Sequence, residues 1–300
     1  MTTYNGEKYL REQLDSIVSQ SVSDFELIIC DDVSNDNTVK IIEEYQKSDS
    51  RIKLYVNQNN LGFLKNFEKA ISLCKGEYIA FCDQDDIWLP NHLEILFNSI
   101  HDKDVCGANA ILVDSNNELL NTSIYQIMGF SRLPTEKEDF AFSIFFQNYF
   151  QGAAMLVKTK FLKNNIPFPK GVKFHDWWLV LCACFENGVV YVKEPVLRYR
   201  QHSNNVTMNE KEGIKKSLKG ILERSNENEL ISQRISLYNN LCLKYENVIS
   251  VLGDLNDFFM KSLYRNRKSA FFLFKNYERL YLNDNYKMKI IRFLKKILLG

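Results

Sequence analysis

Three carboxylates follow one apolar, β-prone stretch of the chain, residues 77–82. Asp83, Asp85 and Asp86 come directly after this stretch, and a helix-forming segment begins a few residues later. In extended backbone, side chains two residues apart leave the same face, so Asp83 and Asp85 would point at one place. Two such carboxylates repel each other unless a cation lies between them, and Mg²⁺ or Mn²⁺ is commonly held by one or two carboxylates plus substrate phosphates. The pattern predicts a divalent-cation site; the alternative is an acidic turn that caps the helix at Asn91.

A second acidic pair, Asp31 and Asp32, follows another buried stretch, residues 25–30. The carboxyl ends of parallel strands lie at the same edge of a sheet, so we expect this pair to lie beside Asp83. An acidic edge suits a nucleotide, because carboxylates accept hydrogen bonds from base N–H groups or ribose hydroxyls while a metal offsets the phosphates. The glycine-rich loops of dinucleotide enzymes and P-loop proteins are absent. For Asp31 and Asp32 the alternative is a turn that caps the next helix.

A further carboxylate, Asp176, stands where a helix is predicted to begin, within His175-Asp176-Trp177-Trp178. It either caps this helix and complements the helix dipole, or acts as a general base that takes the proton of an acceptor hydroxyl. In the second role the dipole would stabilise the anionic carboxylate. Trp177 and Trp178 would then offer flat faces to a sugar ring.

Two more segments are candidates for ligand contacts. The small residues that begin with Gln151 and Gly152 predict a strand start that backbone and ligand can approach closely, on the acceptor side. After a predicted turn at residues 194–195, Arg198 and Arg200 suit a diphosphate leaving group. His202 follows them and would complete the metal shell with the Asp85 carboxylate, although a lone histidine is usually structural.

The elements that must position these residues alternate between strands and helices, which predicts an α/β fold with a parallel, doubly wound sheet. A polar loop is expected from residue 114 to about 134, and a helical pattern begins near residue 212. The Phe residues of 136–149 are expected to pack in the core. The expected strands are 25–30, 52–56, 77–82 and 105–113, and the expected helices are 7–19, 36–47, 64–74, 90–100, 136–149 and 175–186.

The overall charge of +1 hides an asymmetry. Residues 1–210 carry 20 Lys and Arg against 28 Asp and Glu, whereas residues 211–300 carry 18 against 9. This division predicts an acidic, cation-using part and a basic tail. The seven cysteines show no Cys-x-x-Cys spacing, which favours buried thiols in a reducing cytosol. No apolar run approaches 18 residues, and no signal peptide is present.

Four motifs resemble, in order and spacing, the family 2 glycosyltransferases of GT-A fold. Two later segments, residues 175–178 and 199–205, are similar to those of bacterial rhamnosyltransferases that build cell-wall rhamnan or O-antigen chains. The resemblance covers roughly residues 1–207. In that family a strand precedes the Thr-Tyr-Asn segment, and none is predicted here, so we expect the chain to begin late relative to the family. The four motifs are Thr3-Tyr4-Asn5-Gly6, Asp31-Asp32 with Ser34, Asp36 and Thr38, Asn60-Leu61-Gly62, and Asp83-Gln84-Asp85-Asp86 with Trp88-Leu89-Pro90.

The resemblance implies a GT-A (Rossmann-like, mostly parallel) domain over residues 1–207 and an inverting, metal-dependent transfer of a sugar, rhamnose from dTDP-rhamnose, to a hydroxyl in cell-surface polysaccharide synthesis. Asp176 is then the catalytic base, Asp85 and His202 hold Mn²⁺ or Mg²⁺, and Arg198 and Arg200 bind the diphosphate. The acceptor side has Trp177, Trp178, Gln151 and Gly152, and the nucleotide side has Thr3, Tyr4, Asn5, Asp32 and Asp83.

The remaining residues, 208–300, are predicted to form a helical, basic C-terminal region. Residues 261–300 carry 11 Lys and Arg against two acids. The alternatives are a solvated helix face packed on the core, or attachment to an anionic membrane surface. We expect a cytoplasmic protein, peripheral on the inner face of the membrane, that takes a dTDP- or UDP-sugar and a glycan or polyprenyl-diphosphate-linked acceptor. Nucleic acid is not an expected partner, because the first part of the chain is acidic.

Two other functions fit part of the sequence. A strand that ends in Asp-x-Asp also occurs in phosphatases that form an aspartyl phosphate, with Asp83 as the nucleophile. That function leaves Asp31, Asp32 and Asp176 without a role. The other possibility is an inactive transferase remnant that acts as a membrane-bound partner in an assembly complex, and it is motivated by the missing first strand.

Overall fold

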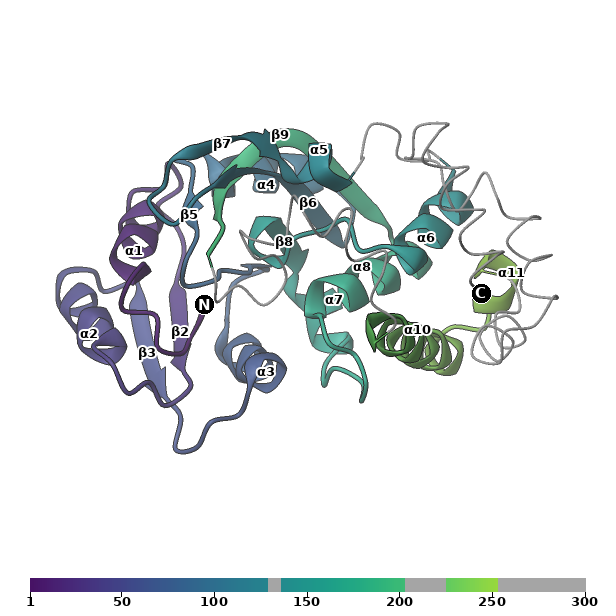
Figure 1. Cartoon of the computed structure of the whole chain (residues 1–300), viewed down its shortest axis with the longest axis horizontal. Coiled ribbons are helices and arrows are strands. Elements are labelled where there is room, and N and C mark those ends of the chain that lie inside the picture. Colours follow the sequence, from purple (N-terminus) through teal and green to yellow (C-terminus); the bar gives the residue numbers. More distant parts are fainter. Residues whose placement is uncertain (129–135, 203–224, 253–300) are drawn as a thin grey trace.

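The computed structural model describes residues 1–128, 136–202 and 225–252, with side chains of the last range from residue 232 onward. Its strands form two sheets that lie side by side, and helices cover them (Figure 1). The predicted boundary at residues 207–208 and the basic segment 261–300 lie outside the described residues. Within these residues, no helix combines the length and the apolar character needed to cross a bilayer.

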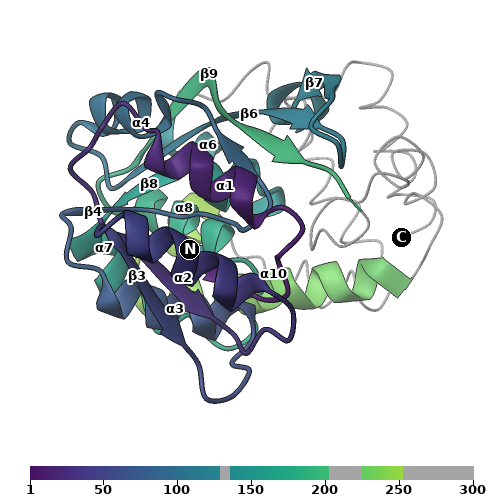
Figure 2. The same cartoon turned by 90° about the vertical axis from the view of Figure 1, so that its left-hand side faces the viewer.

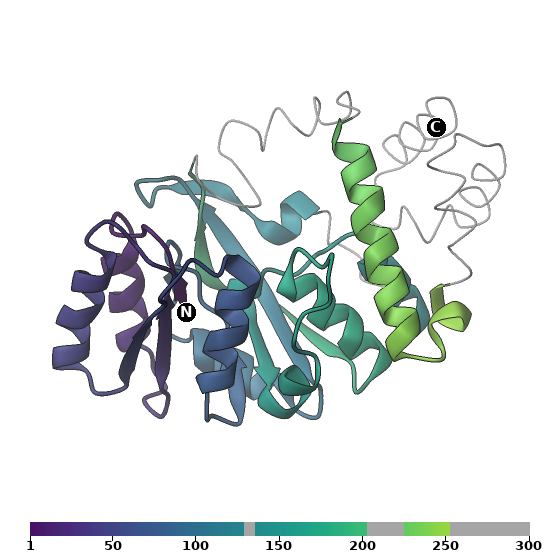
Figure 3. The ribbon, with the colours of Figure 1, turned by 90° about the horizontal axis from the view of Figure 1, so that it is seen from below.

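The first sheet is parallel, as the alternation of strands and helices predicted. Its strand order is β1-β2-β3. Two helices cover one face of this sheet and a third covers the other, as Figures 1 and 3 show; Figure 2 looks onto the side with the two helices. The strands are β1 (Thr2–Thr3), β2 (Leu27–Asp31) and β3 (Ile52–Val56), and the helices are α1 (Leu10–Val18) and α2 (Thr38–Ser48) on one face and α3 (Phe63–Leu73) on the other.

The short strand β1 corrects the prediction that no strand stands ahead of Tyr4. Thr2 and Thr3 pair in parallel with Cys30 and Asp31 of β2. The amino group of Met1 donates to the Ile28 carbonyl at 2.9 Å. Two β-branched residues thus pair with main-chain groups at the edge of the fully buried strand β2. Sequence periodicity cannot reveal a strand of only two residues.

The second sheet is mixed, in the order β4-β8-β6-β9-β5, and β7 pairs with β6. The pair β6–β9 is parallel, and the other pairs are antiparallel. The wholly parallel pairing predicted from the sequence is therefore confined to the first sheet, which ends at residue 56. The strands are β4 (Tyr78–Ala80), β5 (Ile87–Trp88), β6 (Val105–Val113), β7 (Leu119–Ser123), β8 (Met155–Lys158) and β9 (Val189–Arg200).

Three local predictions differ from the structure. Residues 194–195 form no turn: β9 runs through them, and its register against β6 shifts there, as in a bulge. The expected polar loop contains β7 and α5 (Ile124–Met128), because Asp114 accepts hydrogen bonds from the N–H groups of Asn116 and Glu118 and closes a hairpin. A 3₁₀ turn, η1 (Gly152–Ala154), precedes β8.

One helix, α4 (His92–Ile100), packs on one face of the second sheet, in the apolar cluster of Cys106, Ala108 and Leu156. The other remaining helices form a layer on the opposite face, in the cluster of Val105, Met155 and Val157. The described part of the C-terminal region belongs to this layer, since Leu237, Tyr238 and Leu241 of α10 are buried in the same apolar cluster as α6 and α8. Figure 3 shows α10 lying along this side of the molecule. The helices of this layer are α6 (Lys137–Phe146), α7 (Thr159–Asn164), α8 (His175–Phe185), α10 (Ser225–Lys244) and α11 (Val248–Leu252).

Candidate active site

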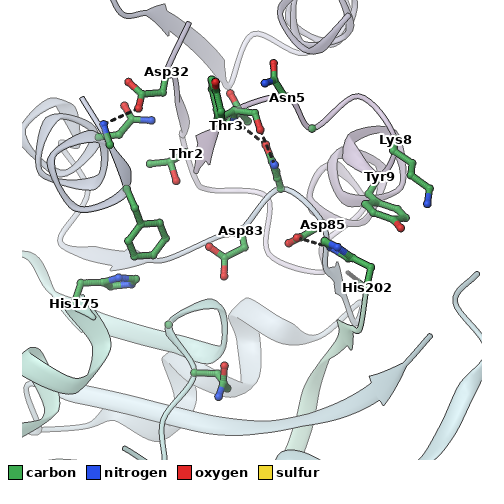
Figure 4. Close-up of a pocket in the computed structure, with 18 of the residues that line it drawn as sticks. Thr2, Thr3, Asn5, Lys8, Tyr9, Asp32, Asp83, Asp85, His175 and His202 are labelled. Carbon is green, nitrogen blue, oxygen red and sulfur yellow. Dashed lines mark hydrogen bonds and ion pairs between the residues drawn. The ribbon is translucent and has the colours of Figure 1, made fainter. Parts of the chain in front are cut away.

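A cavity of about 760 Å³ lies where residues from both sheets meet. Figure 4 shows its labelled side chains: Thr3 and Asp32 above, His175 on one wall, Asp85 and His202 on the opposite wall, and Asp83 between them. Most of the residues predicted to bind ligands line this cavity. They are Thr3, Tyr4, Asn5, Asp32, Asp83, Asp85, Gln151, Gly152, Asp176 and His202.

The two carboxylates at the end of β2 differ in what they bind. Asp31 is a structural group: its Oδ2 accepts from the Thr3 hydroxyl (2.8 Å) and its Oδ1 from the Ser34 N–H (2.9 Å). Asp32 faces the cavity, and its oxygens accept from the N–H groups of Leu61 (2.7 Å) and Gly62 (2.8 Å). These bonds set the orientation of the Asp32 carboxylate at the cavity wall.

The segment after β1 is held by side chains of the loop that follows β2. Asn5 lies in the left-handed region at φ 49°, its N–H donates to the Ser34 hydroxyl, and its side-chain oxygen accepts from the Asn35 N–H. Asparagine tolerates this conformation better than most residues. Tyr4 is 48% exposed and lines the cavity, so its ring is accessible to a ligand.

The acidic loop after β4 divides its carboxylates between the cavity and the interior. The Asp83 carboxylate projects into the cavity and has no hydrogen-bond partner among the described residues. Its pKa is raised, first by burial and then by the nearby Asp85 and Asp176 carboxylates. Asp86 is 1% exposed and accepts from the Arg200 N–H at 3.0 Å, so it is an interior group.

The best candidate for a metal site is Asp85 with His202. Oδ2 of Asp85 lies 2.8 Å from Nε2 of His202. No cluster of three or more potential ligands occurs in the part of the chain that the structure describes. Mg²⁺ and Mn²⁺ are nevertheless commonly held by few protein ligands together with substrate phosphates and water. A carboxylate oxygen and an imidazole nitrogen that converge at a cavity wall fit such a metal.

Asp176 is the first-turn carboxylate of α8 and faces the same cavity. Its Oδ1 accepts from the Trp177 N–H (2.6 Å) and its Oδ2 from the Gly152 N–H (3.2 Å). These hydrogen bonds favour the anion, as the helix position predicts, but burial outweighs them and raises the pKa of Asp176 to about 6. A carboxylate with a pKa near the working pH suits a general base.

His175 is the most unusual group in the site. It is 4% exposed, and neither ring nitrogen has a hydrogen-bond partner among the residues that the structure describes. Burial lowers its pKa to about 3, so the imidazole is neutral. The rings of Phe67 and Phe81 lie at centroid distances of 4.6 and 4.5 Å. A Cβ at Gly152 would lie 2.6 Å from Nε2 of His175, so only glycine fits there.

Four residues predicted to bind ligands do not line the cavity. Trp177 and Trp178 are 6% and 2% exposed, and their indole N–H groups donate to carbonyls of Ile144 and Asn165, so both are core residues. Arg198 donates to the Asn117 side chain at 3.1 Å.

Arg200 is fully buried. It donates to the Glu12 carboxylate (2.8 Å) and to the Asp85 carbonyl (2.8 Å), so its charge is used to hold the acidic loop.

Several cavity residues have no role in the sequence analysis: Lys8, Tyr9, Gln84, Phe63 and, as a side chain, His175. Tyr9 stacks on His202 with centroids 4.9 Å apart. Lys8 and Tyr9 lie in the first turn of the helix expected over residues 7–19, directly after the Thr-Tyr-Asn motif, and this proximity was the available signal.

The two sheets, their helices and the acidic cavity at their junction define a glycosyltransferase of GT-A fold. Residues 1–163 match the model of Glycosyl transferase family 2, and the chain belongs to this family. The catalytic candidate Asp176 and the metal candidate His202 lie beyond the matched residues.

Similar proteins include transferases of different sugars. The chain is 32% identical to "dTDP-rhamnosyl transferase RfbG" of Shigella flexneri, over 68% of this chain and 72% of that one. It is 28% identical to "UDP-Glc:alpha-D-GlcNAc-diphosphoundecaprenol beta-1,3-glucosyltransferase WfgD" of Escherichia coli, over 72% of this chain and 81% of that one.

Solved structures share the fold. TarS 1–349 of S. aureus, in complex with UDP-GlcNAc, has a TM-score of 0.57 at 21% identity, over 99% of this chain and 88% of that one. The mannosyltransferase PcManGT of Pyrobaculum calidifontis, in complex with GDP-Man and Mn²⁺, has a TM-score of 0.54 at 14% identity, over 99% of this chain and 83% of that one.

Proposed function

We propose that this chain is an inverting, metal-dependent glycosyltransferase that moves a sugar from a nucleotide diphosphate to a hydroxyl group. The observation that carries the proposal is the placement of two kinds of group around one cavity. A half-buried carboxylate with a raised pKa, Asp176, lines it together with the converging pair Asp85 and His202. These groups support a reaction that needs a base for the acceptor and a metal ion bound to the leaving group.

The proposed chemistry is a single displacement. Asp176 takes the proton of the acceptor hydroxyl as its oxygen attacks the anomeric carbon from the face opposite the diphosphate. The bond from that carbon to the diphosphate oxygen breaks, the configuration inverts, and the nucleoside diphosphate leaves. The N–H groups of Gly152 and Trp177 hold the Asp176 carboxylate in place. When bound, Mn²⁺ or Mg²⁺ supplies positive charge to the departing phosphate.

The nucleoside would bind at the other end of the cavity. Asp32 offers carboxylate oxygens to a base N–H or to ribose hydroxyls, and the half-exposed ring of Tyr4 offers a stacking face. Thr3 and Asn5 line this end. Asp83, which projects between the two ends, would face the ribose and diphosphate. Gln151 and Gly152, beside Asp176, would lie on the acceptor side.

We further propose that the donor is dTDP-rhamnose and the acceptor a glycan or a polyprenyl-diphosphate-linked glycan of the cell surface. The donor is supported by the likeness to the dTDP-rhamnosyl transferase, and a lipid-linked acceptor by the likeness to the diphosphoundecaprenol glucosyltransferase. A lipid-linked acceptor favours a place on the inner face of the cytoplasmic membrane. The charge of residues 261–300 supports this location.

The test of the function is a calorimetric titration of dTDP and UDP into the full chain, with and without Mn²⁺. Binding is expected to need Mn²⁺ and to be lost in Asp85→Ala. The matched control is Asp102→Ala, because Asp102 is an exposed carboxylate that does not line the cavity. The preferred base then selects the donors for a transfer assay.

Transfer is tested with dTDP-rhamnose and UDP-glucose. Asp176→Asn is expected to lower kcat by about 10²-fold or more while dTDP still binds, because the base is lost and the nucleotide contacts remain. If neither nucleotide shows Mn²⁺-dependent binding, the proposal that this chain is a glycosyltransferase is overturned. It would favour the inactive remnant acting as a partner protein, whereas a trapped phosphate on Asp83 would favour the phosphatase.

A further inference from the structure

The cavity carries more negative than positive charge. Four carboxylates line it: Asp32, Asp83, Asp85 and Asp176. Among the described residues, Lys8 is the single lysine or arginine in the lining. A nucleoside diphosphate adds further negative charge to this cavity. A protein cation near the phosphates would offset part of this charge in addition to the metal, and the arginines predicted for this role do not line the cavity.

Lys8 lies on the same side of the cavity as the metal pair. Its Nζ is 4.7 Å from the ring centre of Tyr9, and the same ring stacks on His202 at 4.9 Å. His202 in turn contacts the Asp85 carboxylate. Figure 4 shows Lys8 and Tyr9 coming from one segment, above His202. The ring of Tyr9 thus connects the ammonium group to the imidazole.

The ammonium group of Lys8 is available for a ligand. Within the described residues it has no carboxylate partner and no hydrogen bond; its contact is with the face of Tyr9. Tyr9 itself is 8% exposed, because the Arg200 guanidinium also lies over its ring, at 4.6 Å. The contact with the Tyr9 ring keeps the charge near the site without neutralising it.

We propose that Lys8 binds the diphosphate of the donor beside Asp85 and His202 and stabilises it as it leaves. This inference rests on the proposed function and identifies the protein side chain whose positive charge stabilises the leaving group. As the bond from the anomeric carbon to the diphosphate oxygen breaks, the electron pair goes to that oxygen. The ammonium group offsets the charge that develops there.

The test compares three ligands of one nucleoside on the full chain in Mn²⁺: dTDP, dTMP and thymidine. Lys8→Ala is expected to weaken dTDP binding by about tenfold, dTMP binding less, and thymidine binding by less than twofold. Lys8→Arg keeps the charge and is expected to recover most of the affinity. Lys47→Ala, which removes an exposed lysine of α2 outside the cavity, is the control.

Transfer kinetics add a second measurement. Lys8→Ala is expected to lower kcat with the preferred donor as well as raise its KM, because the charge on the leaving group grows in the transition state. If Lys8→Ala matches Lys47→Ala in dTDP affinity and kcat, while Asp85→Ala still abolishes binding, the role of Lys8 is overturned and the transferase stands. If the unmodified chain binds neither dTDP nor UDP, both proposals fall.

Discussion

The side-chain amide of Gln84 is hydrogen-bonded in both directions to the main chain of Tyr4. The Tyr4 N–H donates to Oε1 of Gln84 at 2.9 Å, and Nε2 of Gln84 donates to the Tyr4 carbonyl at 3.1 Å. A Cβ on Gly6 would lie 2.3 Å from Oε1, so a glycine is needed beside this contact. Gln84 thus joins the acidic loop to the segment proposed to bind the nucleoside.

Replacing Gln84 by Glu is expected to weaken both parts of the site. The substitution removes the donor to the Tyr4 carbonyl and places a fourth carboxylate in the 83–86 loop. Because the contact is partly exposed, we expect a loss of about 1 kcal/mol in unfolding free energy, or about 2–4 °C in Tm. Affinity for dTDP should fall as well. Thermal denaturation and calorimetry measure both, and Gln126→Glu, at a local contact with Ser123, is the control. Equal behaviour of the two variants would contradict the role of Gln84.

The rate of transfer is expected to rise with pH as Asp176 loses its proton. A base must be deprotonated, and burial raises the pKa of Asp176 to about 6. The rate should therefore increase about tenfold from pH 5 to pH 7 and level off above that. The measurement is kcat at saturating donor across this range, with dTDP affinity followed at each pH. A rate that is flat from pH 5 to 7 would show that a different group limits the reaction.

The contact of Gly152 with His175 predicts a coupled pair of substitutions. Gly152→Ala forces a methyl group against the imidazole, which the rings of Phe67 and Phe81 hold in place, and should destabilise the fold by about 1–3 kcal/mol. In a His175→Ala background the same change should cost much less. Urea unfolding of the parent, both single variants and the double variant gives the coupling energy. Additive effects would mean that the two residues do not press on each other.

A second buried histidine, His92, is expected to make the free energy of unfolding depend on pH. His92 stacks on Trp88 with centroids 3.9 Å apart, its Nδ1 lies 3.0 Å from the Val196 carbonyl oxygen, and burial lowers its pKa to about 3. Below pH 6.5 the unfolded chain binds a proton that the folded chain excludes. The stability present above pH 6.5 is therefore lost on acidification, by about 2 kcal/mol at pH 5.

His92→Phe keeps the stacking and removes this penalty. It should be less stable than the parent by about 1 kcal/mol at pH 8, from the lost hydrogen bond, and more stable at pH 5. Urea unfolding of both proteins at the two pH values shows whether the order reverses. A constant difference would show that His92 is not buried as a neutral group.

Local patterns predicted the residues that stand at the ends of elements. Asp32 and Asp83 follow apolar strands, Asp176 begins a helix, and each lines the cavity. The core position of two side chains inside a long helix was not predicted. Trp177 and Trp178 begin a helix that is buried on nearly all sides, and this all-round apolar character was the available signal for a core position.

Whether a charged side chain is neutralised or left facing the cavity depended on partners far away in the sequence. Arg200 is neutralised by Glu12, 188 residues earlier, and no local pattern reveals such a pair. Lys8 was overlooked for the same reason: its place in the cavity follows from the fold around Tyr9. The mixed second sheet also depended on distant pairing, since β4 and β6 pair with β8 rather than with each other.

The long strand β9 leads directly to the last of the proposed site residues. His202 follows β9 directly and reaches Asp85 across 117 residues, while Thr3 and Asp32 already belong to the first sheet. A ribosome makes the nucleoside end of the cavity well before Asp176, and the last metal candidate later still. Residues 1–56, which hold the strands of the first sheet, are therefore synthesised before the residues of the proposed reactive centre. The proposed site is complete only with β9 in its place between β6 and β5.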